Sequence, residues 1–338
     1  MPVPTEAVGR IERRCAAGGD LAELRRDLVE ELRRSVGFEF YAFLMTDPRS
    51  AVGAAPMAEI PSVPDLPRLI RLKYLTPVNR WTALTTPVGL LRQGGDPARS
   101  LVWREWMAPF GIADVASVVF RDRYGCWGFL DLWRTGKAFT AAEAGFLARL
   151  AGPMTTAMRS GLAETFRQRP PVAERTGPIV LMLSAELDLL GQTPQTSALL
   201  RTLVPPSPGR AVIPAGAYNV AAQLLANEAE VDTHPPYARV HLSEGEWLTL
   251  RADRLGDDIA VSIERSSPAE RLDLFSRAFG LSAREAELLR RLAAGADTRE
   301  VAQLLFLSEH TVQDHLKSIF AKTGLRTRPS LLSHALGS

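Results

Sequence analysis

The sequence predicts a multidomain protein in which two α+β domains precede an all-α domain. Its 338 residues are enough for two or three domains. Residues 38–133 and 179–263 contain short apolar and aromatic runs bounded by turn residues, which indicates strands. A polar, proline-rich segment between them, residues 167–178, is typical of a linker. The last fifth of the chain instead has apolar residues at helical spacing behind repeated helix-start signals.

Residues 1–166 are expected to form the first α+β domain. Leucines three and four residues apart predict the first helix, and aromatic and β-branched runs predict the strands. A turn from Asp122 to Gly125 joins two of these runs in a hairpin, and a capping box at Thr140 and Glu143 opens a long helix. The predicted elements are a helix over 10–36, strands over 38–44 and 53–60, a helix over 64–74, the hairpin over 115–133 and the helix from 141.

Two stretches of this region resemble known domains. The segment FTAAEAGFLARLAGPMTTAMR, with the hairpin before it, resembles the end of a GAF domain. The segment SVGFEFYAFLM resembles the start of the acyl-homoserine-lactone-binding domain of some LuxR proteins. That domain has an Asp-Pro pair that holds the lactone amide, whereas this chain has Thr76-Pro77. The departure argues against a homoserine lactone, and we interpret residues 1–166 as an α+β GAF-like sandwich.

A sandwich of this kind can enclose a small-molecule pocket. Five of the six tryptophans lie between Trp81 and Trp133, which favours an aromatic ligand-binding region. For each aromatic residue the alternative is plain core or surface packing. No histidine precedes His234, so this region offers none to haem or a metal, and we expect no cofactor. The candidate lining residues are Tyr41, Tyr74, Trp81, Trp103, Trp106, Phe110 and Trp127.

Residues 179–265 are expected to form the second α+β domain. A strand begins at Ile179, and a short helix is predicted through Leu199 and Leu203. Alternating runs around Gly245 predict a hairpin, and residues 258–263 predict another strand. The succession resembles a small PAS domain, which could hold a pocket or serve as a relaying or dimerising spacer. Residues 266–279 are expected to connect it, partly as a helix, to the last domain.

Residues 280–338 carry the clearest pattern in the chain. Capping boxes begin at Ser282 and Asp297, and Ser308 caps a third helix. Val312, Leu316 and Ile319 lie on one face of that helix. His310, Gln313, Asp314 and Lys317 lie on the other. Two short helices, of which the second has an apolar inner face and a polar outer face, predict a helix-turn-helix whose outer face meets base edges in the major groove.

This unit resembles the DNA-binding domain of the LuxR/FixJ class of bacterial regulators. The resemblance rests on Glu300-Val301-Ala302, Thr311-Val312 and Lys322-Thr323-Gly324 at their spacing. It implies an all-α four-helix domain whose third helix enters the major groove and whose fourth helix often dimerises. The family often has a basic residue where this chain has Gln313, and Asp314 places an acidic residue on the expected reading surface.

The resemblance also implies which side chains contact DNA. Base contact is expected first for Lys317 and then for Gln313. His315 could instead be packed or contact a phosphate, and Arg299 and Lys322 could be phosphate contacts or solvated charges. The expected DNA-binding residues are Arg299, Ser308, His310, Thr311, Gln313, Asp314, His315, Lys317, Lys322 and Arg328.

The charge distribution limits which partners the chain is expected to bind. The chain has a net charge of +2, and residues 270–338, with ten Lys/Arg and eight Asp/Glu, carry all of that excess. Phosphate attraction dominates nonspecific DNA binding, so one copy should bind weakly and a homodimer on two half-sites is favoured. The expected partners are a double-stranded DNA operator, a second copy of the chain, a small-molecule effector and RNA polymerase.

Several other classes of protein are disfavoured. No apolar run approaches the ~20 residues that span a bilayer, and the N-terminus lacks an apolar signal core, so we expect a cytoplasmic protein without membrane contact. Cys15 and Cys126 are too few for a disulfide scaffold; we expect plain thiols, with a redox role as the alternative. No P-loop, metal-ligand pair or nucleophile elbow is present, so we expect no enzyme.

The sequence therefore predicts a sequence-specific transcription regulator controlled by a small molecule or another signal at its GAF-like and PAS-like regions. The alternative is a signalling adaptor whose helical C-terminus mediates protein–protein contact or dimerisation.

Overall fold

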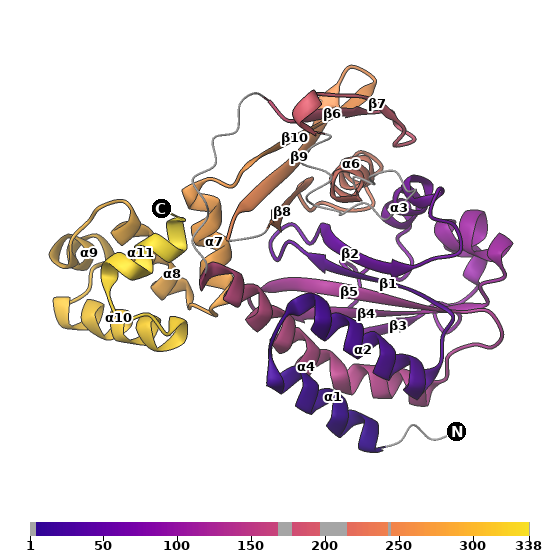
Figure 1. Cartoon of the computed structure of the whole chain (residues 1–338), viewed down its shortest axis with the longest axis horizontal. Helices are drawn as coiled ribbons and strands as arrows, with labels where there is room; N and C mark the ends of the chain where they lie inside the picture. Colours follow the sequence, from indigo (N-terminus) through magenta and orange to yellow (C-terminus); the bar gives the residue numbers. More distant parts are fainter. Residues whose placement is uncertain (1–4, 168–177, 197–214, 243–244, 338) are drawn as a thin grey trace. The chain divides into compact units, whose positions relative to one another are not determined.

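The computed structural model describes residues 5–167, 178–196, 215–242 and 245–337, and Figure 1 shows their helices and strands. The chain divides into two compact units. The first comprises residues 1–158, 175–240 and 249–264, and the second comprises residues 159–174, 241–248 and 265–338. The three-domain division at residues 166, 179, 265 and 280 stays a prediction.

A five-stranded antiparallel sheet forms the base of the first unit. Its strand order is β2-β1-β5-β4-β3. The expected strands and the expected hairpin are confirmed, and β3 is an addition that the sequence did not predict. The strands are β1 (Phe40–Thr46), β2 (Gly53–Glu59), β3 (Val88–Leu90), β4 (Asp114–Asp122) and β5 (Gly125–Arg134).

Helices cover both faces of this sheet. Helices α1 (Thr5–Ala17), α2 (Leu21–Val36) and α4 (Ala141–Glu164) lie along one face, and α3 (Leu66–Leu75) lies on the other (Figure 1). Short helical turns, η1 (Pro97–Arg99), η2 (Trp103–Met107) and η3 (Ala108–Phe110), lead from β3 to β4, and η4 (Thr165–Arg167) follows α4.

The prediction of one continuous helix over residues 10–36 is wrong. Gly18 and Gly19 adopt φ angles of 66° and 106°, which right-handed helix does not allow, and they separate α1 from α2. Asp20 then caps α2 by accepting a 2.9 Å hydrogen bond from the Glu23 N–H. The break lets α1 pack back along α2, where Arg14 pairs with Asp27 at 2.6 Å.

A second five-stranded sheet repeats the topology of the first. Its order is β7-β6-β10-β9-β8, so that both sheets read 2-1-5-4-3 when the strands of each are numbered from its own start. The predicted strands from residues 179, 238, 247 and 258 are confirmed, whereas the helix through Leu199 and most of the linker lie outside the described residues. The strands are β6 (Val180–Leu183), β7 (Leu189–Gln192), β8 (Tyr237–His241), β9 (Trp247–Leu255) and β10 (Asp258–Arg265).

Helix α6 (Ala215–Glu228) was not predicted from the sequence. It contacts α3 and β2 of the first sheet region, and a Cβ on Gly216 would lie 3.1 Å from Leu250 Cδ2 of β9. Because the helix is buried on nearly all sides, its sequence AGAYNVAAQLLANE lacks the charged, exposed face of a surface helix. Its polar residues Asn219, Gln223 and Asn227 follow one another at intervals of four but are buried or half-buried.

Buried ion pairs join the two sheet regions of the first unit. Asp47, at the end of β1, pairs with Arg239 of β8 at 2.5 Å, and both side chains are at most 2% exposed. Burial opposes the charge of Asp47, but the Arg239 guanidinium lowers its pKa. Arg80 pairs with Asp232 at 2.7 Å and donates to Gln223 of α6 at 2.9 Å.

The described residues from 265 onward in the second unit form five consecutive helices. The predicted capping boxes at Ser282 and Asp297 and the cap at Ser308 are confirmed, and the connector contains a helix with its own capping box at Ser267. Among the described residues, no helix has the length and apolarity that crossing a membrane requires. The helices are α7 (Pro268–Ala278), α8 (Ala283–Ala293), α9 (Thr298–Leu305), α10 (Glu309–Thr323) and α11 (Arg328–Leu336).

Candidate functional site

Helix α10 presents a polar face to solvent. Val312, Leu316 and Ile319 are buried on its inner side, and Ser308 holds its first turn by accepting a 3.1 Å hydrogen bond from the Thr311 N–H. The opposite side is exposed, as the spacing predicted, and carries His310, Gln313, Asp314 and Lys317. This set is called the α10 face below.

Asp314 lies between His310 and Lys317 on the α10 face. Its carboxylate is 3.1 Å from Lys317 Nζ and 3.5 Å from His310 Nε2. The hydrogen bond from Lys317 lowers the pKa of Asp314, so the carboxylate is ionised at neutral pH. It offsets much of the positive charge that the face would offer to phosphates, so hydrogen bonding must contribute more of any DNA affinity there.

Glu285 fixes α10 on α8. Its carboxylate accepts hydrogen bonds from Ser318 Oγ at 2.6 Å, from Lys322 Nζ at 2.5 Å and from the Ser282 N–H at 2.6 Å. Burial opposes the charged form, but these donors lower the pKa of Glu285 to about 2. Lys322 is thus engaged inside the helical unit, and its contact with DNA stays a prediction.

The other predicted DNA contacts have varied surroundings. Arg328 donates to the Ala296 carbonyl at 2.5 Å, and the hydroxyls of Ser308 and Thr311 share a 2.8 Å hydrogen bond. Arg299 is exposed on α9, whereas His315 is half-buried on α10. Only the exposed side chains are immediately available to a phosphate or a base.

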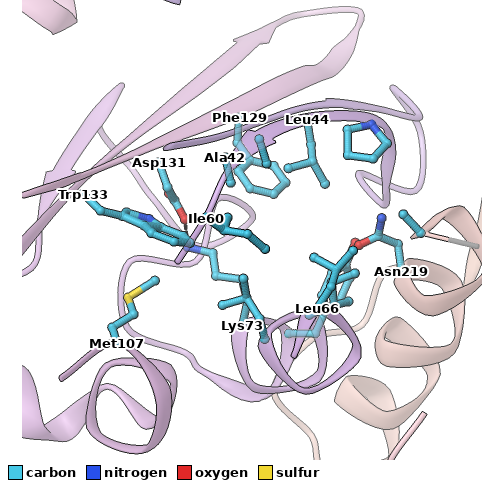
Figure 2. Close-up of a pocket in the computed structure, with 16 residues that line it drawn as sticks. Ala42, Leu44, Ile60, Leu66, Lys73, Met107, Phe129, Asp131, Trp133 and Asn219 are labelled. Atoms are coloured by element: carbon cyan, nitrogen blue, oxygen red, sulfur yellow. Dashed lines mark ion pairs between the residues drawn. The ribbon is translucent and has the colours of Figure 1, made fainter. Parts of the chain in front are cut away.

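The first unit contains a cavity between its first sheet and helices α3 and α6 (Figure 2). Its volume is about 60 Å³. A single water needs roughly 10–15 Å³ on the same scale, so several waters or a small molecule fit. The lining residues are Ala42, Leu44, Pro56, Ala58, Ile60, Leu66, Leu69, Ile70, Lys73, Tyr74, Met107, Phe129, Asp131, Trp133, Ala215 and Asn219.

Of the seven aromatic residues predicted to line a pocket, Tyr74 alone lines this cavity. Its hydroxyl accepts a 2.9 Å hydrogen bond from the Gly53 N–H, and burial raises its pKa. Tyr41 lies on the opposite face of β1 from Ala42, with the Arg33 guanidinium 5.8 Å from its ring.

The remaining predicted aromatics pack outside the lining. Trp81 stacks on Phe129 with ring centroids 4.3 Å apart, and its indole donates to the Ala51 carbonyl. Trp106 packs against Phe110 and Trp133, Trp103 donates to the Ile112 carbonyl, and Trp127 donates to Asp122. Trp81, Trp106 and Trp127 are core residues, whereas Trp103 is half-buried and Phe110 is exposed.

The polar residues of the cavity were not among the candidates that the sequence predicted. Lys73 and Asp131 form a 2.6 Å ion pair, and the Asp131 side chain is 2% exposed. A signal for Asp131 was available, because an acidic residue interrupts the apolar run CWGFLDLW of a predicted strand. Asn219 could not have been found in this way, since α6 itself was not predicted.

Both cysteines are buried and free. Burial raises the pKa of Cys15 to about 11 and also raises that of Cys126. Both thiols therefore stay protonated at neutral pH, which disfavours the reactive thiolate that a redox role requires.

Comparisons with known proteins identify the C-terminal helices. Residues 280–335 match the family described as bacterial regulatory proteins, luxR family. Over 56 residues, 17% of this chain, the sequence is 43% identical to the oxygen regulatory protein NreC of Staphylococcus aureus strain JH9. The match covers 26% of NreC, so the chain spans about a quarter of the length of the curated relatives it matches.

Two solved structures align over most of the chain at low similarity. Escherichia coli SdiA is 14% identical with a TM-score of 0.34, over 94% of this chain and 92% of SdiA. Bacteriophytochrome RpBphP3 from R. palustris is 15% identical with a TM-score of 0.32, over 77% of this chain and 62% of that protein. Scores of this size carry no conclusion about the first unit. The family match and the geometry of α8 to α11 do carry one: residues 280–335 form a helix-turn-helix domain of the luxR family of bacterial regulatory proteins.

Proposed function

We propose that the chain is a sequence-specific, DNA-binding transcription regulator that acts as a homodimer and is controlled by a signal received in its first unit. The observation that carries the proposal is the exposed α10 face on a luxR-family domain. An exposed polar helix face opposite a buried apolar one is what major-groove recognition requires.

The residues of the α10 face have complementary chemistries. Gln313 can pair with adenine and Lys317 with guanine, while Asp314 can orient Lys317 or accept from cytosine. Arg299, His315, Lys322 and Arg328 are proposed as phosphate contacts that set the position of the helix without reading sequence.

The two sheet regions are proposed as the receiving part. Residues 1–166 and 179–265 would correspond to GAF-like and PAS-like domains, and the strand order that both sheets share supports treating them as related modules. A bound molecule would change DNA affinity by binding one dimer arrangement more tightly than another. RNA polymerase is proposed as the protein partner that responds to this change in DNA binding.

A pair of matched variants tests DNA recognition. Lys317→Ala and Arg290→Ala each remove one exposed cation and one intrahelical i,i+3 ion pair. On a duplex selected from a random pool, Lys317→Ala in the full chain should weaken binding by roughly 5- to 150-fold and relax base preference. Arg290→Ala on α8 should stay close to wild type. Equal binding by both variants in fluorescence anisotropy would show that α10 is not the reading helix.

An adaptor role for the C-terminal helices has one observation in its favour. Leu304 and Phe306, at the end of α9, are 52% and 95% exposed. An apolar protein contact through these residues should be nearly insensitive to salt, whereas DNA binding weakens steeply as salt rises. Pull-down of a protein that survives 0.5 M salt and depends on Phe306, with no duplex bound at low salt, would favour the adaptor.

A further inference from the structure

A helix from the second sheet region contributes to the lining of the cavity in the first unit. Most of the cavity's lining residues come from β1, β2, β5 and α3, η2 contributes Met107, and α6 contributes Ala215 and Asn219. Figure 2 shows Met107 and Asn219 beside the other labelled lining residues. The wall is almost entirely aliphatic and aromatic, with few polar side chains among its residues. An apolar cavity with a small number of placed polar groups is the usual form of a small-molecule site.

Asn219 is the lining residue whose polar group is left wholly unused among the described residues. Asp131 Oδ1 and Trp133 Nε1 are further buried lining atoms without a hydrogen-bond partner there, but the Asp131 carboxylate is already paired with Lys73. The Asn219 side chain is fully buried, and neither its Nδ2 nor its Oδ1 has a hydrogen-bond partner among the described residues. A Cβ on Gly53 would lie 3.4 Å from Asn219 Cγ, so β2 approaches the amide closely without bonding to it. An unpaired buried amide destabilises the fold, and a ligand that bonds to it would remove that penalty.

The charges in the cavity already cancel. Lys73 and Asp131 pair with each other at 2.6 Å, and Lys73 is 12% exposed. A charged ligand would lose its hydration and find no unpaired counter-charge among the lining residues that the structure describes. The site therefore favours an uncharged molecule.

We propose that this cavity binds a small, uncharged, mostly apolar molecule whose terminal carboxamide-like group, with one donor and one acceptor, is recognised by Asn219. The apolar body lies against Leu44, Leu66, Ile70 and Phe129. Because α6 carries Asn219, the ligand links the first sheet region directly to the second. The effector role of this site rests on the proposed function, whereas ligand binding itself does not.

Three probes of six heavy atoms each test the chemistry on the full chain. Butanamide donates and accepts, 2-pentanone only accepts, and butanoate carries a charge. In ligand-detected NMR titrations we expect butanamide to bind about five- to tenfold more tightly than 2-pentanone, the effect of one or two hydrogen bonds. Butanoate should show no binding at the same concentrations.

Two variants connect binding to the cavity. Asn219→Leu keeps the size but removes the amide, so it should weaken butanamide about five- to tenfold and leave 2-pentanone within twofold. It should also raise the unfolding midpoint of the free chain by about 2–4 °C, because an unpaired amide is replaced by an apolar group. Ala42→Leu fills the cavity and should abolish binding of both neutral probes.

The possible outcomes distinguish a failure of the proposed ligand site from a failure of the proposed function. Butanamide affinity that is unchanged in Asn219→Leu, or a lowered unfolding midpoint in that variant, would overturn the site. Asn219-dependent binding that leaves affinity for the selected duplex unchanged would uphold the site and contradict its role as the effector site.

Discussion

Glu285 combines a local helix cap with two long-range contacts. Its place three residues after Ser282 predicts the capping box, which depends only on helix geometry. Its bonds to Ser318 and Lys322 bridge 33 and 37 residues of sequence and exist only because α8 and α10 cross. One carboxylate thereby fixes both the start of α8 and the position of α10, the proposed recognition helix.

Glu285→Gln should loosen α8 and α10 in a pH-dependent way. At pH 7 we expect the free energy of local opening to fall by about 1–3 kcal/mol, because Lys322 loses its counter-charge. The pKa of Glu285 is lowered from 4.5 to about 2, so its stabilising effect is complete above pH 4.5 and is lost as the pH falls through 2. The difference in opening free energy between Glu285→Gln and the wild-type chain should therefore shrink as the pH falls from 4.5 to 2.

Hydrogen exchange on peptides from α8 and α10 measures this difference at pH 6 and pH 3. Glu287→Gln is the matched control, because Glu287 pairs only with exposed Arg290 and Arg291 on the same helix among the contacts described. It should change the opening free energy by less than about 0.5 kcal/mol. Equal effects of the two variants at pH 6 would contradict the role assigned to Glu285.

At the scale of an element, the β4–β5 hairpin depends on one close backbone approach. Gly125, in the predicted turn, has a φ of 150°, and a Cβ there would lie 2.2 Å from the Pro48 carbonyl oxygen. That carbonyl accepts a 3.2 Å hydrogen bond from the Cys126 N–H. The turn therefore docks on the β1–β2 connection, and its glycine is needed for space as well as for conformation.

Gly125→Ala should destabilise the first unit by about 1–3 kcal/mol, because the added methyl group must displace backbone atoms. Gly136→Ala is the matched control, since a Cβ at Gly136 meets no atom within 4 Å. It should stay within about 0.5 kcal/mol of wild type. Urea unfolding followed by tryptophan fluorescence reports the first unit, and a similar shift for both variants would rule out the docking explanation.

For the whole molecule, the small net charge limits the DNA affinity of a single copy. The net charge of the chain is +2, and Asp314 offsets cationic charge on the α10 face. Few phosphates can be neutralised by one protomer, so doubling the contacts in a homodimer is the direct route to useful affinity.

The salt dependence of full-chain binding tests this arrangement. Arg299→Ala removes a proposed phosphate contact, and it should weaken binding to all sequences alike. It should reduce the slope of log K against log salt by about 1 per protomer, or about 2 for a bound dimer. Arg290→Ala should leave the slope unchanged, and sedimentation should find two chains per duplex. A single chain per duplex would contradict the dimer.

Sequence patterns alone predicted the elements whose signals are local. The capping residues Ser282, Asp297 and Ser308, the exposed α10 face and the β4–β5 hairpin depend on neighbours within a few residues, and all are present in the structure. The break at Gly18 and Gly19 is a local signal as well, because glycine readily adopts positive φ angles, and the regular leucine spacing begins only after it, at Leu21.

Tertiary structure decided the candidate ligand site. Asn219, Lys73 and Asp131 meet in one cavity because α6 returns to the first sheet from about 80 residues or more away in sequence, and no local pattern encodes that return. A helix buried on nearly all sides lacks the charged, exposed face of a surface helix, and an unpaired amide can be recognised only when its surroundings are known. The sequence by itself thus determined the DNA-binding domain, through caps and periodicity that act over a few residues, while packing between distant segments decided where a ligand could bind.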